Sequence, residues 1–424
     1  MSIDIISVII VIAALILFSI KKIPMWVSGL IVMLAAFWTG CMAWEDVSAG
    51  FSNKVVVLIA AMSVIGAALV ETGLGAKIGN LLMKFAGDSE KKAVLAVLII
   101  GVLLGVFVNG SVAVGIMMPV VDCLVIRSRG KITRKALYFP MGIAPVFGNG
   151  TTSFSASSML TCVALLTAAG YREIQAFEPL KITGVACVVF ILFYYFVIYP
   201  MSKKQFDYPD PPYEGDIQDP DDVDMSKYPV WKQWVAGLTM IGVVIALISG
   251  ANYAAWPLLG VVVVVLTGCI SPKKAINSVN WGVIITVAAS LGFGSILSKT
   301  GGGEMIAKFL VGLAGPLASN HTVMTMLLTL VAALISVPLA DGATVAVSVP
   351  IAISICTLQG WDAVPIIIAM HCGLKICQFM SPVCTGCVTQ CLGGGYRGKD
   401  FLKLGGLISL VAYVCVIAMI FIFY

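Results

Sequence analysis

The sequence consists of apolar runs that are each about as long as a lipid bilayer is thick, separated by short charged loops. Only 11% of the residues are charged and 60% are apolar. Charged residues make up about a quarter of an ordinary soluble domain. A folded chain of this composition must expose apolar side chains to lipid, and helices satisfy their own backbone polar groups there. The sequence therefore predicts an all-α integral membrane protein.

Ten runs match the roughly 20 residues that a helix needs to cross a bilayer. The first five precede a polar segment, and the second five follow it. We predict membrane-spanning helices at 3–20, 25–43, 54–72, 135–169, 179–201, 231–249, 252–270, 280–298, 363–392 and 402–424.

Two further apolar runs, 93–126 and 323–357, do not fit single crossings, because polar, glycine-containing segments interrupt their centres. The interruptions are at 109–111 and 341–343. Each arm is about 15 residues, or about 23 Å of helix, which is shorter than the roughly 30 Å hydrocarbon core. We therefore predict two re-entrant hairpins whose tips lie in protein or line a wet cavity.

The two halves of the chain share landmarks in the same order. Thr72 and Gly73 recur as Thr300 and Gly301, and other matched pairs follow at similar spacings. Since each half has an odd number of crossings, the second copy would be inverted relative to the first. We predict a first inverted repeat at 1–201 with a broken helix at 135–169, an acidic linker at 202–230, and a second repeat at 231–424 with a broken helix at 363–392.

The distribution of Lys and Arg predicts the orientation of the chain. If the basic loop at 127–135 is cytoplasmic, most of the remaining Lys and Arg fall on the same side. Both termini are then extracytoplasmic, the acidic linker is cytoplasmic and solvated, and the location is the cell inner (plasma) membrane. The net charge of +5 comes from these loops, so it does not indicate a nucleic-acid partner.

The predicted broken helices carry the polar residues most typical of a transport site. Glycine, proline and hydroxyl residues cluster at 147–153 and 381–386, both within apolar runs. Unwound backbone of this kind frees carbonyl groups for a cation and directs helix N-termini at an anion. Each break could also be a packing kink, but four interruptions in symmetric positions favour one shared binding site.

Several stretches resemble the divalent anion:sodium symporters, a family of dicarboxylate, citrate and sulfate carriers in the ion transporter superfamily. They are 50–53 with 67–74, 107–119, 148–152, and 382–385 with 393–403. The resemblance implies an elevator mechanism, in which a transport domain moves against a scaffold, and a homodimer. It also implies a Ser-Asn-Thr motif at each hairpin tip, with ligands for sodium and for carboxylate. Here Asn109-Gly110-Ser111 and Ala340-Asp341-Gly342 stand at those positions, and Thr385 keeps one threonine of the second broken helix.

Two sets of candidate site residues follow from the motif positions and from the breaks. The candidate substrate-binding residues are Asn109, Gly110, Ser111, Thr151, Thr152, Gly342, Ala343, Thr344, Lys375 and Thr385. The candidate cation-binding residues, expected to take sodium, are Asn109, Gly148, Asn149, Gly150, Ala340, Asp341 and Cys384.

Asp341 and Lys375 are charged residues in apolar runs, which marks them as functional candidates. Asp341 could bind sodium or carry a proton, and Lys375 could bind an anion. The two could also form a structural ion pair. His371 lies one helical turn before Lys375, so it is either a proton relay or an ordinary polar residue of the helix.

The sequence thus predicts a secondary active transporter of small di- or tricarboxylates, or a related dianion, coupled to sodium or proton symport. A sodium/proton antiporter on the same scaffold is the alternative. An intramembrane metal or redox protein, based on the cysteines at 372–391, is a third hypothesis, but no transition-metal site is expected from a single C-x-x-C. No hydrolytic motif and no resident cofactor is predicted, so the chain is not expected to be an enzyme.

Overall fold

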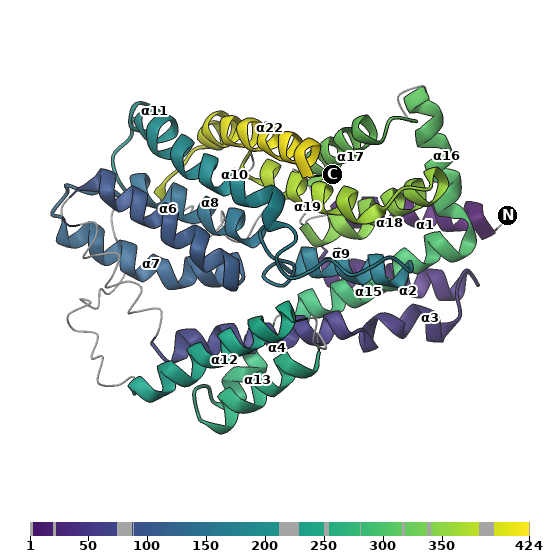
Figure 1. Cartoon of the computed structure of the whole chain (residues 1–424), viewed down its shortest axis with the longest axis horizontal. Helices are drawn as coiled ribbons and strands as arrows, with labels where there is room; N and C mark the ends of the chain where they lie inside the picture. The colour runs from purple at the N-terminus through teal and green to yellow at the C-terminus, as the bar shows by residue number, and fades with distance from the viewer. Residues whose placement is uncertain are drawn as a thin grey trace.

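A computed structural model of the chain describes residues 3–19, 23–73, 87, 89–211, 229–249, 254–279, 281–315, 319–336, 341–380 and 394–423. These residues form helices joined by turns, and no β-strand occurs among them. The prediction of an all-helical protein is therefore confirmed. The chain is elongated, with α6, α7 and α8 at one end and α16, α18 and the N-terminal helix at the other (Figure 1).

The helices of the first half begin and end as follows: α1 (Ile3–Ser19), α2 (Met25–Trp38), α3 (Trp44–Ser48), η1 (Ala49–Ser52), α4 (Lys54–Glu71), α6 (Glu90–Phe107), α7 (Gly110–Arg127), α8 (Arg134–Asn149), α9 (Ser157–Ala168), α10 (Leu180–Phe193), η2 (Tyr194–Ile198) and α11 (Tyr199–Gln205). Those of the second half are α12 (Val230–Ile248), α13 (Ala255–Leu266), α14 (Pro272–Ser278), α15 (Trp281–Thr300), α16 (Gly302–Ala314), α17 (His321–Ser336), α18 (Asp341–Gln359), α19 (Ala363–Cys377), η5 (Gln378–Met380), α21 (Gly398–Asp400), η7 (Phe401–Gly405) and α22 (Gly406–Phe423).

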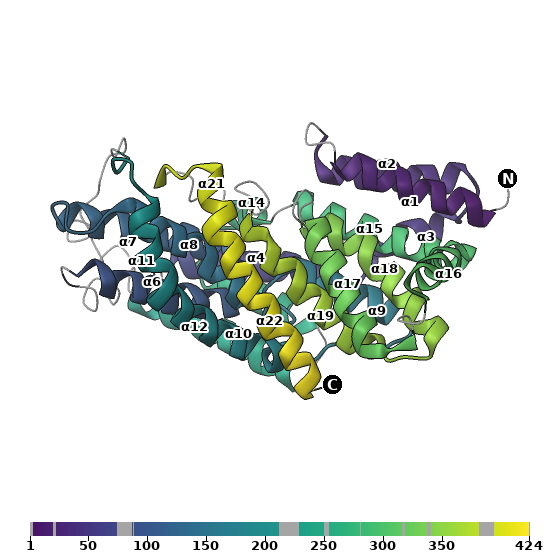
Figure 2. The same cartoon turned by 90° about the horizontal axis from the view of Figure 1, so that it is seen from above.

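Helices that the sequence matched between the two halves pack in matching ways. In the first half α6 lies along α8 and touches α7, and in the second half α17 lies along α19 and touches α18. Helices near the start of each half pack on the other half: α2 packs on α15, and α13 packs on α4. Figure 2 shows α1 and α2 lying together beside α15.

Glycine permits the closest of these helix contacts. A Cβ atom added to Gly148 of α8 would lie 2.1 Å from the carbonyl oxygen of Val102 in α6. A Cβ added to Gly373 of α19 would lie 2.8 Å from the carbonyl oxygen of Thr329 in α17. Small residues let helix backbones approach within a membrane, where packing rather than the hydrophobic effect holds helices together.

The helix breaks in the described residues occur close to the predicted positions. The run 93–126 is interrupted at Val108 and Asn109, between α6 and α7, and the run 135–169 is unwound at 150–156, between α8 and α9. The second hairpin contains α17 and α18, but residues 337–340 at its tip lie outside the described residues. The predicted second break at 381–386 lies outside them as well.

Four described helical stretches are long and apolar enough to cross a membrane: Trp44–Glu71, Leu180–Gln205, Val230–Leu247 and Gly398–Phe423. Shorter apolar helices lie among them, including α9 and α19. Large apolar side chains are exposed along α12, such as Leu238 and Ile241, as expected of a surface that faces lipid. The short helices α3 and α14, which precede α4 and α15, were not predicted from the sequence.

Candidate functional site

The break between α8 and α9 is a buried loop whose carbonyl groups are bonded by neighbouring hydroxyl groups. The Oγ1 atom of Thr151 donates to the carbonyl oxygen of Gly148 at 2.6 Å, and Ser155 Oγ donates to that of Asn149 at 3.2 Å. The carbonyl oxygen of Gly150 accepts from Thr183 Oγ1 of α10, also at 3.2 Å. The three carbonyl oxygens that the sequence predicts as cation ligands thus accept hydrogen bonds from hydroxyl groups in this conformation.

The side chain of Asn149 joins this broken helix to the tip of the first hairpin. Its amide is oriented with the nitrogen toward two carbonyl oxygens of the tip, because the opposite orientation would set oxygen against oxygen. The nitrogen then donates to Gly105 at 2.6 Å and to Val108 at 2.9 Å, and the oxygen accepts from the Gly110 N–H at 2.8 Å. These are backbone groups that helix ends leave without intrahelical partners. The Asn149 side chain thus stabilises the hairpin tip.

The other residues of the first tip have mainly local contacts. The side-chain oxygen of Asn109 accepts from the Ser111 N–H at 3.1 Å and so caps the start of α7. Asn109 is exposed, whereas Gly110 is buried. Thr152 of the neighbouring break donates to the Val106 carbonyl at 3.2 Å. The structure therefore brings the first tip and the first break into direct contact.

At the second tip, Lys375 of α19 forms an ion pair with Asp341, the first residue of α18. Both are largely withdrawn from the surface, since the exposed fractions of the two side chains are 11% for Lys375 and 23% for Asp341. A carboxylate at a helix N-terminus is stabilised by the helix dipole. Gly342 and Thr344 lie in the same first turn of α18, and Thr344 is buried.

Lys375 also connects the second tip with the first break. It lines a cavity of about 20 Å³ together with Gly150, Thr183 and the rings of Phe147 and Phe379. The ring of Phe147 stacks on the ring of Phe379 at a centroid distance of 5.3 Å and on the ring of Phe190 at 4.0 Å. A cavity of this size has room for about one water molecule. The described cavity at Lys375 is therefore small in this conformation.

His371 links the two halves of the chain one turn before Lys375. Its Nε2 atom lies 2.9 Å from the hydroxyl oxygen of Ser158 in α9. The residue is fully buried, and among the described residues its Nδ1 atom has no hydrogen-bond partner. His371 is thus a contact between the halves as well as a candidate proton carrier.

At the end of the molecule where α8 begins, the first acidic residues of the predicted linker are bound rather than simply solvated. Asp210 accepts from the backbone N–H groups of Arg134 and Lys135, at 2.9 and 3.0 Å, which caps α8. The Arg134 side chain donates to Asp122 of α7, which also accepts from Tyr138 at 2.7 Å. Asp122 therefore ties the second arm of the first hairpin to the start of the broken helix.

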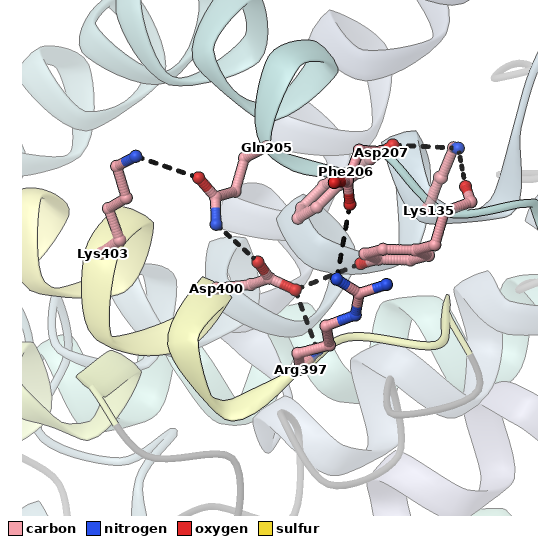
Figure 3. A network of polar contacts seen from close by, with 8 residues as sticks. Lys135, Gln205, Phe206, Asp207, Arg397, Asp400 and Lys403 are labelled. Carbon is pink, nitrogen blue, oxygen red and sulfur yellow. Dashed lines mark hydrogen bonds and ion pairs between the residues drawn. The ribbon is translucent and has the colours of Figure 1, made fainter.

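A second group of contacts joins the same linker to the second half of the chain (Figure 3). Asp400 is fully buried and accepts from Gln205 at 2.9 Å and from the backbone N–H of Arg397 at 2.8 Å. The hydroxyl group of Tyr208 donates to Asp400 at 3.3 Å, and burial together with this carboxylate raises the pKa of the tyrosine. Tyr208 therefore remains a donor at neutral pH.

The structure brings together part of the predicted site. The first tip and the first break contain eight of the predicted residues in contact with one another: Asn109, Gly110, Ser111, Gly148, Asn149, Gly150, Thr151 and Thr152. Asp341 and Lys375 meet at the second tip. Ala340, Cys384 and Thr385 lie outside the described residues, and so does the side chain of Ala343. Ser155, Thr183 and the Phe147–Phe379 stack were not predicted, because no sequence pattern distinguishes them from packing residues.

The hypothesis of an intramembrane metal or redox protein, based on the cysteines, gains no support from the described part of the chain. The seven cysteines that the structure describes as free include Cys162 and Cys372. Within the described residues, no group of three or more His, Cys, Asp or Glu side chains could hold a metal ion. Cys384, Cys387 and Cys391 lie outside those residues.

The described residues thus form a helical protein with apolar spans long enough to cross a membrane and with an ion pair, Lys375 with Asp341, largely withdrawn from the surface. The sequence profile of the CitMHS family, described as a citrate transporter, matches residues 15–424. The chain therefore belongs to the citrate transporter family, which is a family of transporters rather than of enzymes.

Similar proteins agree with this class. "Uncharacterized transporter YfbS" of Escherichia coli is 31% identical over 180 residues, which are 42% of this chain and 29% of the relative. The match thus spans less than a third of that relative's length. The structure of MtrF of Neisseria gonorrhoeae, described with a class of antimetabolite efflux pumps, aligns with 100% of this chain and 95% of its own, with a TM-score of 0.62 and 15% identity.

A second structure, the YdaH transporter of Alcanivorax borkumensis, covers 89% of this chain and 87% of its own, with a TM-score of 0.59 and 13% identity. At these identities the two structures show that the fold is shared.

Proposed function

We propose that the protein carries small di- or tricarboxylates, such as citrate, across the membrane together with sodium or protons. The observation that carries this proposal is the ion pair of Lys375 and Asp341 next to the first helix break. Lys375 supplies the positive charge that a carboxylate needs in a site of low dielectric constant. The membership of the citrate transporter family supports the same class of substrate.

The ion pair suggests how anion and cation transport are coupled. A substrate carboxylate that binds Lys375 competes with Asp341 for the same ammonium group. Asp341 then loses the positive charge of Lys375, and breaking a buried ion pair costs about 3–5 kcal/mol. A sodium ion or a proton at Asp341 offsets that cost. Binding of the anion and binding of the cation thereby favour each other.

The movement we propose is of the elevator type, in which a transport domain, made of the hairpins and broken helices of two inverted repeats at 1–201 and 231–424, moves against a scaffold. The matched packing of α6 with α8 and of α17 with α19 supports this assignment. In this proposal the two hairpins re-enter from opposite sides, the first from the cytoplasm and the second from outside, and the ten predicted spans leave both termini outside the inner membrane. A cavity of about 20 Å³ at Lys375 is too small for a tricarboxylate, so the site must open to load substrate. A homodimer would supply the fixed scaffold.

The proposal is tested by uptake of labelled citrate, succinate and sulfate into proteoliposomes, with sodium and proton gradients imposed separately. We expect accumulation of at least one carboxylate under one gradient. Loss of a hydrogen bond to a charged group costs about 1.5–3 kcal/mol, so Lys375→Gln should raise the KM for the carboxylate about ten- to a hundredfold. The control Lys308→Gln removes an exposed charge of α16 and should leave KM unchanged. No anion accumulation under either gradient contradicts the proposal.

The same experiment distinguishes binding from a purely structural ion pair. Replacing both partners, as in the double variant Asp341→Asn with Lys375→Gln, removes the buried charges together. If the pair serves only stability, the double variant regains uptake. We expect it to fold but to remain defective in carboxylate uptake, because the positive partner of the substrate is still absent.

A sodium/proton antiporter is the second candidate, and the partial exposure of Asp341 favours it. In that case Asp341 exchanges a proton for sodium and no organic anion moves. Proton flux, measured with a pH-sensitive dye after sodium is added in the absence of organic acids, separates the two candidates. Sodium-driven proton release under those conditions supports the antiporter, and its absence supports the anion carrier.

A further inference from the structure

A larger cavity, of about 210 Å³, is lined by other helices than those that line the cavity at the proposed transport site. The end of α4, the start of α12 and the segment that joins α13 to α14 form its wall. Lys232, Lys274 and Ser271 line it, together with Glu71 and Gly268. It shares no lining residue with the cavity at Lys375, so the proposed carboxylate site does not account for it.

The described wall of this cavity carries an excess of positive charge. Lys274 Nζ lies 2.6 Å from a carboxylate oxygen of Glu71, and both side chains are substantially exposed. Lys232 Nζ donates to the carbonyl oxygen of Gly268 at 2.7 Å and lies 5.6 Å from the ring centroid of Trp231. A carbonyl group is neutral, so it does not cancel the lysine charge. Among the described lining residues, two ammonium groups therefore face one carboxylate.

Aromatic residues place this cavity at the surface of the bilayer. Trp231 and Trp234 lie in the first turns of α12, with exposed fractions of 53% and 65%. Exposed tryptophans at a helix end mark the level of the lipid headgroups. Beyond them, α12 exposes large apolar side chains such as Ile241 and Ile245. The cavity thus lies at the start of a helix whose exposed apolar face can hold acyl chains.

We propose that this cavity binds the phosphate group of an anionic phospholipid, with Lys232 and Lys274 on either side and the Ser271 hydroxyl group as a further donor. Bonds between ammonium groups and phosphate are charge-assisted and about twice as strong as neutral ones. Lys274 can turn from Glu71 to the phosphate because its side chain is 61% exposed. Free phosphate offers the same headgroup chemistry, but it cannot use the apolar face of α12. The predicted topology puts the cavity on the side that carries most of the Lys and Arg, where anionic lipid attracts basic groups.

The proposal is tested by thermal unfolding of the delipidated full chain in detergent, after addition of phosphatidylglycerol, phosphatidylcholine or inorganic phosphate. A ligand at about 100 times its Kd stabilises the folded state by about 2.7 kcal/mol, so we expect phosphatidylglycerol to raise Tm by several degrees. Phosphatidylcholine, which has no net charge, and inorganic phosphate should each raise it by less than half as much. The double variant Lys232→Gln with Lys274→Gln should lose the response to phosphatidylglycerol.

The matched control is the double variant Lys54→Gln with Lys308→Gln. It removes the same net charge from two exposed ion pairs elsewhere and should keep the full response. An equal rise in Tm with phosphatidylcholine, or an equal loss of response in the control, overturns the proposal. A full rise with inorganic phosphate overturns the assignment to a lipid.

Native mass spectrometry provides a measurement that does not depend on a folded variant. Unmodified protein released from nanodiscs with equal phosphatidylglycerol and phosphatidylcholine should retain phosphatidylglycerol preferentially, and retention without preference overturns the proposal. Carboxylate uptake is a separate measurement, so failure of this inference is distinguishable from failure of the transport proposal.

Discussion

The side-chain oxygen of Asn149, the last residue of α8, lies 2.8 Å from the backbone nitrogen of Gly110, the first residue of α7. The same side chain donates to two carbonyl oxygens near the end of α6. One buried amide thus satisfies backbone groups on both sides of the hairpin break, and the first tip is fixed to the first broken helix.

Replacing Asn149 should therefore destabilise the protein more than removing an ordinary helix cap. Asn149→Ala leaves an N–H and two carbonyl groups without this partner, and each buried unsatisfied group costs about 1–3 kcal/mol. Asn320→Ala is the control, because Asn320 is exposed and its side chain caps α17, which is worth about 1 kcal/mol. Thermal unfolding in detergent measures both. Equal losses in Tm for the two variants would mean that the Asn149 contacts contribute no more than a cap.

The two close glycine contacts should each resist enlargement. Gly148→Ala would place a methyl group 2.1 Å from the Val102 carbonyl oxygen, and Gly373→Ala one 2.8 Å from that of Thr329. Overpacking of this kind costs about 1–3 kcal/mol. Gly115→Ala in α7 is the control, because nothing lies within 4 Å of its added methyl group. It should be neutral or stabilising by up to about 1 kcal/mol. A destabilisation by Gly115→Ala as large as by Gly148→Ala would contradict the packing argument.

The capping of α8 by Asp210 should be visible in amide hydrogen exchange. Asp210→Ala removes the acceptor for the N–H groups of Arg134 and Lys135, so the first turn of α8 should exchange several-fold faster. Asp207→Ala is the control, since the Asp207 side chain forms an exposed ion pair with Arg397 at 3.4 Å. Unchanged exchange at the start of α8 in the Asp210 variant would show that the linker does not support this helix.

Glu178 should give the stability of the protein a defined pH dependence. Burial opposes its ionisation, but hydrogen bonds from Arg172 and from the Gln175 N–H outweigh burial, so the pKa of Glu178 lies below its ordinary value. The carboxylate therefore contributes stability above about pH 4.3, and this contribution is lost as pH falls through the lower pKa of the folded state. Glu178→Gln should lower Tm at about pH 7, and the difference from the unmodified protein should shrink at lower pH.

The control for this prediction is Glu304→Gln. Glu304 and Lys308 form an exposed pair on α16, and exposed pairs contribute about 0–1 kcal/mol. This variant should change Tm little at any pH. A Tm difference for Glu178→Gln that stays constant down to about pH 3 would contradict a lowered pKa.

Much of the helical architecture could be predicted from the sequence, because each apolar run long enough for a bilayer must become a helix in lipid. The helix interruptions at Asn109 and after Asn149 could also be predicted from the sequence, because glycine and polar residues interrupt an apolar run there. The pairing of Asp341 with Lys375 was one of two open alternatives, and the structure shows the pair. Whether Lys375 also binds the substrate remains a prediction.

Other parts of the site depended on tertiary structure. Thr183 and Ser158 look like ordinary residues of apolar helices, yet they contact Gly150 and His371 from other segments. The linker residue Asp210 looked solvated, but it caps a helix 75 residues away from it in sequence.

The sequence by itself determined that lipid surrounds the chain, which segments form helices and where the helices break, because these features follow from local hydropathy and backbone chemistry. Only the tertiary structure decided which side chains satisfy the broken ends, because those partners come from segments far apart in the chain.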